Sequence, residues 1–255
     1  YTTRPTGKSM PAFSHLELLP EPQRHAVNLA LTSKRELNAD PKAGISLGIG
    51  SVIQSEPEAQ ITLHSDRMIS VAGTVDAPAG NISLTLDKNL SAEGFLPDKA
   101  IWLTDGARLL APSYVQLLPN DWGRREGQVL DAGTVNLQAK DGFIVTEAGS
   151  EIDASGTSQT LDILTEEKNK SNFLPVSVVG DAGAINLTAA DGMFLDGEFS
   201  AKAAAVPGAA GGSLSITLDS DPRPDESAVG GSTFYLPKGP RVLLLTSSEN
   251  STLPE

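Results

Sequence analysis

The chain has 255 residues, a formal net charge of −13 and no cysteine. A chain of this length can bury a sizeable core without disulfides. The acidic balance disfavours nucleic acids and anionic membrane surfaces as partners, because binding phosphate requires a surplus of lysine and arginine. No segment approaches the ~20 apolar residues that cross a bilayer, so no membrane insertion is expected.

Residues 1–43 are expected to be irregular apart from one early coil. Pro20 and Pro22 interrupt this stretch, and neither residue suits the interior of a helix or a central strand. Apolar and polar residues alternate within His25–Lys34, as they do in a short strand. Because the sequence opens at Tyr1 rather than at a methionine, we expect the chain to be a segment of a longer protein.

Residues 44–220 contain a repeated unit. The sequence DAGTVNLQAKDGF, which begins at Asp131, returns at Asp181 as DAGAINLTAADGM. The stretch GNISLTLD at Gly80–Asp87 is echoed by GSLSITLD at Gly212–Asp219. Apolar and polar residues alternate within each copy, which favours half-buried strands over helices.

The spacing of the repeat predicts a β-solenoid. Ile61 and Ile82 lie 21 residues apart, about one coil of such a fold. Each coil adds a strand to several parallel sheets, and stacked coils bury one continuous core. Glycine suits the corners because it permits positive φ or close backbone approach, and aspartate and asparagine cap the turns. Four alanines suit a tight inner corner: Ala77, Ala132, Ala154 and Ala182.

We therefore predict an all-β protein, a parallel β-helix that forms one continuous structural domain over residues 1–255. Four polar or proline-rich stretches interrupt the repeat and are expected to protrude as loops: 88–100, 118–130, 157–180 and 219–232. Residues 221–255 are expected to add a final strand at Arg241–Thr246 and a polar tail.

Carboxylates are the first candidates for chemistry, because β-helix enzymes often cut polysaccharides with acidic pairs. Asp141 and Asp191 lie one rung apart if 157–180 is a loop and two rungs apart if it holds a coil. Either spacing is compatible with glycosidase geometry. We interpret these aspartates as turn caps, with a Ca²⁺ ladder and catalysis as the alternatives. The set is Asp131, Asp141, Asp153, Asp181 and Asp191.

No residue is assigned as catalytic, cofactor-binding or metal-binding, and no cofactor is expected. His15, His25 and His64 stand in no metal-binding motif and are expected to be solvated or half-buried. Trp102 is expected to face outward from its strand.

Trp122 lies in NDWGRRE beside Arg124 and Arg125. This tryptophan belongs either to a ligand-binding loop, where it could stack on a sugar ring, or to a loop packed on the coil.

Three units of this chain resemble the repeats of filamentous haemagglutinin-like large exoproteins of Gram-negative bacteria, the secreted partners in two-partner secretion. They are AGTVNLQAKDGFIVTEAGSEIDASG, AGAINLTAADGMFLDGEFSAKA and AGNISLTLD. The resemblance implies a right-handed parallel β-helix, export in the unfolded state, and a secreted or cell-surface location. The secretion domain's NPNG-type motifs are absent, so the outer-membrane transporter is expected to act through regions outside this chain.

The implied function is that of a structural and adhesive segment, an adhesin that mediates attachment or cell–cell contact and is not an enzyme. Its partners would be glycans or host or sibling cell surfaces, bound through protruding loops. Two alternatives stay open. One is a polysaccharide-active lyase or glycosidase, which needs acidic residues gathered with arginine or lysine in one groove. The other is the stalk of a toxin-delivery exoprotein.

Overall fold

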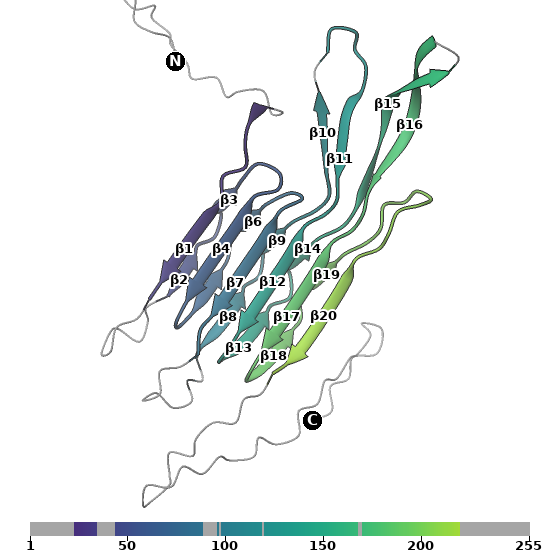
Figure 1. The fold of residues 1–255 in the computed structure, drawn as a ribbon. Coiled ribbons are helices and arrows are strands. Elements are labelled where there is room, and N and C mark those ends of the chain that lie inside the picture. The colour runs from purple at the N-terminus through teal and green to yellow at the C-terminus, as the bar shows by residue number, and fades with distance from the viewer. Residues whose placement is uncertain are drawn as a thin grey trace, which may run out of the picture.

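The computed structural model of the chain describes residues 23–34, 44–88, 96, 98–118, 120–167 and 170–219 (Figure 1). These residues form twenty strands and no α-helix. Within the described ranges, therefore, no helix is long and apolar enough to span a membrane.

Sixteen of the strands belong to three parallel sheets, and each coil of the chain adds one strand to each sheet in turn. Sheet A contains β1 (Leu29–Ser33), β4 (Gln60–Ser65), β7 (Asn81–Leu86), β12 (Thr134–Ala139), β17 (Ala184–Ala189) and β20 (Ser213–Leu218). Sheet B contains β2 (Ile45–Leu47), β5 (Ile69–Val71), β8 (Ala100–Leu103), β13 (Phe143–Thr146) and β18 (Gly192–Leu195). Sheet C contains β3 (Val52–Gln54), β6 (Thr74–Asp76), β9 (Arg108–Leu110), β14 (Glu151–Asp153) and β19 (Glu198–Ser200). The parallel stacking confirms the predicted all-β, parallel β-helix architecture.

The register follows the sequence repeat. Ile61 pairs with Ile82, at the spacing that predicted one coil. Thr134–Ala139 pairs with Ala184–Ala189, so the two copies of the repeated unit are direct neighbours in sheet A. The strand predicted within His25–Lys34 is present as β1, which pairs with β4.

The core lies between the three sheets. In β7 the alternate residues Ile82, Leu84 and Leu86 are fully buried, and the residues between them point outward. The inward faces of all three sheets join in one apolar cluster. Ala77 and Ala154 are fully buried at a corner, as predicted. Ala132 and Ala182 are only half-buried, because they lie where the chain returns from two projecting hairpins.

Glycines precede the sheet A strands because neighbouring rungs approach closely there. A Cβ on Gly133 would lie 2.6 Å from the carbonyl carbon of Gly80 and closer still to its oxygen. Gly183 and Gly212 face the carbonyl oxygens of Gly133 and Gly183 in the same way. The rung-to-rung hydrogen bond from Thr134 N–H to Gly80 O, 3.0 Å long, depends on this approach.

Two antiparallel hairpins project from the coil side by side (Figure 1). The first pairs β10 (Tyr114–Leu118) with β11 (Glu126–Leu130), and the second pairs β15 (Thr157–Glu167) with β16 (Lys170–Gly180). Each follows a sheet C strand and returns the chain to sheet A. The stretches 118–130 and 157–180, predicted as protruding loops, do protrude, but they form paired strands instead of loops. These long segments leave the coil, so their backbone N–H and C=O groups cannot bond to its strands, and antiparallel pairing gives them hydrogen-bond partners within each hairpin.

Several sequence predictions lie outside the described residues. They include most of the loop at 88–100, the loop at 219–232 beyond Asp219, and the strand at Arg241–Thr246.

Candidate functional site

The predicted aspartates act mainly as caps between neighbouring rungs. Asp131 Oδ1 accepts the N–H of Asp181 at 2.8 Å, and Asp181 Oδ1 in turn accepts the N–H of Ala210 at 2.8 Å. The same atom type on successive rungs thus performs the same task, which confirms turn capping for both residues.

Two further aspartates cap turns at other corners. Asp191 Oδ2 accepts the N–H of Gly142 at 2.8 Å, and Asp153 Oδ1 accepts the N–H of Ser155 at 2.9 Å. Asp141 lies one rung from Asp191, because β12 and β17 are direct neighbours and 157–180 holds no coil. Spread over separate corners and engaged with backbone donors, these caps lend no support to the polysaccharide-cleaving alternative.

Arg125 and Asp162 join the two hairpins. Arg125 donates its backbone N–H to Asp162 Oδ2 at 2.8 Å, and its guanidinium lies 3.2 Å from Asp162 Oδ1. Asp162 returns its own N–H to Arg125 O at 2.9 Å. Asp162 pairs across the hairpin with Pro175, which has no N–H to donate to the carbonyl oxygen of Asp162. The backbone hydrogen bond from Arg125 is the main cause that lowers the pKa of Asp162.

Trp122 and Arg124 lie in the turn of the first hairpin. The guanidinium carbon of Arg124 lies 5.2 Å from the centroid of the Trp122 ring and 3.8 Å from that of Phe173, on the second hairpin. Trp122 remains 74% exposed. Asn120 fixes the turn, because its Oδ1 accepts the N–H groups of Trp122 and Arg124 at 3.1 and 3.0 Å. The result is an ordered, outward-facing aromatic group held by cation–π contacts.

Apolar side chains are exposed along both hairpins. Twelve large hydrophobic side chains are exposed within the described residues, and seven of them belong to the hairpins. The hairpins nevertheless make up the smaller part of the described chain. We call these seven the hairpin surface: Leu117, Leu118, Trp122, Ile163, Leu164, Leu174 and Val176. Exposed apolar side chains mark an interaction site where they form a contiguous patch.

Trp102 faces outward from sheet B, as predicted. It is half-buried between the fully buried Ile101 and Leu103. Its Nε1 donates to Glu147 Oε1 at 2.8 Å, and Glu147 Oε2 accepts the N–H of Asp105 at 2.9 Å. These bonds give Trp102 a structural role in joining two rungs.

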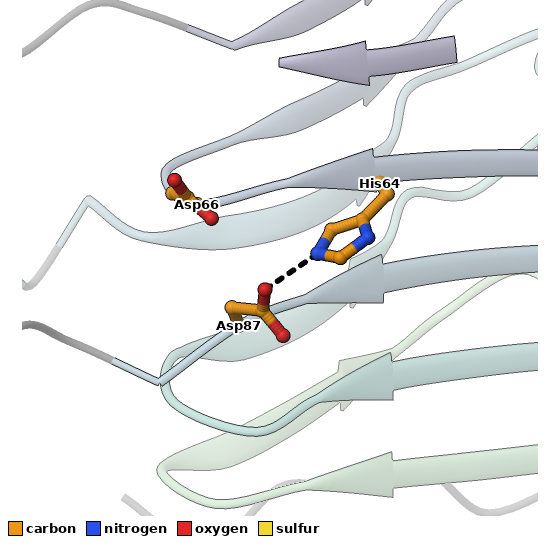
Figure 2. Close-up of side chains that lie close together, drawn as sticks. All are labelled: His64, Asp66 and Asp87. Carbon is orange, nitrogen blue, oxygen red and sulfur yellow. Dashed lines mark hydrogen bonds and ion pairs between the residues drawn. The ribbon is translucent and has the colours of Figure 1, made fainter. Parts of the chain in front are cut away.

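A second cluster lies where the first strands of sheet A end. His64, Asp66 and Asp87 come together there, and their candidate ligand atoms all lie within 4.8 Å of one another (Figure 2). His64 Nε2 lies 2.6 Å from Asp87 Oδ2. All three residues are half-buried.

Lysines surround Asp87 in this cluster. Lys140 Nζ lies 2.8 Å from Asp87 Oδ1, and Lys99, a fully buried lysine, donates to the carbonyl oxygen of Asp87. The hydrogen bond from Lys140 is the largest cause that lowers the pKa of Asp87, and His64 adds to it against the opposing effect of burial. Asp87 is therefore held as a carboxylate at neutral pH.

Sequence reasoning did not bring His64 together with its two aspartates. The 21-residue repeat spacing of Ile61 and Ile82 also separates Asp66 from Asp87, and it could have indicated that these two residues are neighbours. In the structure Ser65 pairs with Leu86, so Asp66 and Asp87 stand on adjacent rungs. His25, by contrast, lies exposed before β1, and His15 falls outside the described residues.

Comparisons of the chain with protein-family models, with curated proteins and with solved structures gave no match.

Proposed function

We propose that this chain is a structural and adhesive segment of a filamentous haemagglutinin-like exoprotein at the surface of, or secreted by, a Gram-negative bacterium. The stacked coil acts as the rigid spacer, and the two hairpins make the contact with a glycan or a cell surface. The resemblance of the repeats to that family supports the placement, and the hairpin surface supports the adhesive role.

The observation that carries the proposal is the contrast between coil and hairpins. The coil buries most of its apolar residues in one core and caps its corners, whereas the hairpins expose seven large apolar side chains. An exposed tryptophan held by Arg124 can stack on the apolar face of a sugar ring, and aromatic anchors of this kind often dominate binding energy. Leu164, on the neighbouring hairpin, is 51% exposed and adds apolar area.

An adhesion assay tests this proposal. Beads coated with the intact chain are offered to a glycan array, to epithelial cells and to bacterial cells, and bound beads are counted. The test variants are Trp122→Ala and Leu164→Ser. The matched control is Ile49→Ser, which removes a side chain 92% exposed in a coil turn between β2 and β3.

We expect each hairpin variant to weaken binding about tenfold, which corresponds to about 1.4 kcal/mol, with the control unchanged. Equal binding by all four proteins would show that the hairpin surface is not the contact. Binding by none of them to any of the three targets would contradict the adhesive role and leave only the spacer.

A further inference from the structure

We propose that His64, Asp66 and Asp87 form a binding site for a divalent transition-metal ion such as Zn²⁺, where the neighbouring strands β4 and β7 of sheet A end. The site is separate from the hairpin surface and does not depend on the proposed adhesive function. It also departs from the sequence analysis, which assigned no metal ligand.

The donor set fits this class of ion. One imidazole nitrogen and two carboxylate oxygens are ligands that Zn²⁺ accepts, whereas Ca²⁺ and Mg²⁺ prefer oxygen alone. A fourth position would be filled by water. Because only three protein ligands are present, we expect affinity in the micromolar range, weaker than that of a four-ligand structural zinc site.

The geometry requires small side-chain movements only. Ligands about 2.0–2.1 Å from a tetrahedral Zn²⁺ stand about 3.3 Å apart. The candidate atoms now lie at most 4.8 Å apart, and the pair formed by His64 Nε2 and Asp87 Oδ2 lies at 2.6 Å. The ion would enter between these two atoms and draw Asp66 inward, as the arrangement in Figure 2 permits.

The backbone is already organised for binding. Asp66 follows β4 and Asp87 follows β7, and the in-register pairing of these strands fixes the spacing of the two residues at about one rung, ~4.8 Å. Asp66 N–H donates to Ser33 O and Asp87 N–H to Ser65 O, so both residues continue the ladder of sheet A. The backbone therefore needs no rearrangement for binding, whereas the contact between His64 Nε2 and Asp87 Oδ2 must open to admit the ion.

Lys140 has a defined part in this site. It holds Asp87 Oδ1 at 2.8 Å, which orients the carboxylate and leaves Oδ2 directed at His64. Outer partners that orient a ligating carboxylate are common at metal sites. Metal ions bind a neutral imidazole nitrogen and an ionised carboxylate, so protons compete with the ion for both kinds of ligand. Binding should therefore weaken on acidification.

The test uses the untagged intact chain after treatment with a chelator. Co²⁺ is titrated while its visible absorption is recorded, and Zn²⁺ binding is measured by calorimetry at pH 7.5 and pH 5.5. The test variants are His64→Gln and Asp87→Asn. His25→Gln is the matched control, because it removes an exposed histidine that lies before β1, outside the cluster. Far-UV circular dichroism checks that every variant is folded.

We expect one Co²⁺ per chain with an intense tetrahedral absorption band, displaced by Zn²⁺ but not by Ca²⁺. His64→Gln and Asp87→Asn should each weaken Zn²⁺ binding at least tenfold, and His25→Gln should bind Zn²⁺ as the unchanged chain does. Zn²⁺ should also raise the melting temperature of the unchanged chain and not that of His64→Gln. Undiminished Zn²⁺ binding by His64→Gln, or no binding by the unchanged chain at millimolar Zn²⁺, would overturn the proposal.

Discussion

Replacing Gly133 by alanine tests the close stacking of the coil. The added Cβ would lie 2.6 Å from the carbonyl carbon of Gly80, whereas nonbonded carbons prefer about 3.5–4.0 Å. The carbonyl oxygen of Gly80 lies closer still, so the two rungs would have to separate locally by about 1.5 Å. The hydrogen bond from Thr134 N–H to Gly80 O would then stretch from 3.0 Å beyond bonding distance, and the 2.8 Å bond from Gly133 N–H to Ala111 O would be strained with it.

The expected cost follows from these two effects. Overpacking costs about 1–3 kcal/mol, and each hydrogen bond lost costs about 1 kcal/mol. Alanine also lowers the conformational entropy of the unfolded chain, which offsets about 0.4–1 kcal/mol of this loss of stability. We therefore expect Gly133→Ala to destabilise the chain by about 2–4 kcal/mol. With a urea m-value of about 2 kcal/mol/M, the midpoint falls by roughly 1–2 M, measured by far-UV circular dichroism.

Gly48→Ala is the matched control. A Cβ there meets no atom within 4 Å, and the backbone does not have positive φ. This substitution should be neutral or stabilising by up to about 1 kcal/mol. If Gly133→Ala behaved like Gly48→Ala, the reasoning that glycine is required by close rung-to-rung approach would be refuted.

Two further predictions concern buried charge and the link between the hairpins. Because the pKa of Asp87 is lowered by folding, this residue stabilises the fold above its unfolded pKa, near 3.8, and the contribution is lost as the pH falls through the folded pKa. The pKa of Asp76 is raised, chiefly by burial, so the sign is opposite. Its contribution is present below the unfolded pKa and is lost as the pH rises through the folded pKa. At pH 7, Asp87→Asn should lower the free energy of unfolding by about 0.5 kcal/mol, and the urea midpoint with it, whereas Asp76→Asn should raise the midpoint. Both effects should fade near pH 3. Midpoint shifts of the same sign at pH 7 would contradict the two pKa directions. Asp162→Ala should speed hydrogen exchange at Arg125 and along β11, with β12 and β17 as the internal control, and unchanged exchange in β11 would show that the Arg125–Asp162 contact does not hold the hairpins together.

Local pattern was sufficient to predict the coil. Ile82, Leu84 and Leu86 alternate with polar residues, and a two-residue period in a short strand leaves one face to bury. The spacing of Ile61 and Ile82 predicted their pairing, because a parallel in-register coil places equivalent residues on adjacent rungs. Turn capping by Asp131 and Asp181 was predictable for the same reason.

The hairpins were harder to predict. The stretches 118–130 and 157–180 are polar and carry proline, as in Pro175, so they were interpreted as loops. Their pairing is antiparallel and many of their apolar side chains are exposed, so they lack the regular one-sided burial of the coil strands. The contacts from Arg124 to Phe173 and from Arg125 to Asp162 depend on two insertions meeting in space.

The sequence by itself determined the repeat, the inward faces of the strands, and the corners that require glycine or aspartate. These features depend on residues close in the chain or one coil apart, where a simple period carries the information. Only the tertiary structure decided which side chains meet across rungs and hairpins. His64, Asp66 and Asp87 form a cluster because a particular register places the ends of β4 and β7 together, and a shift of that register by a single residue would have turned His64 toward the core.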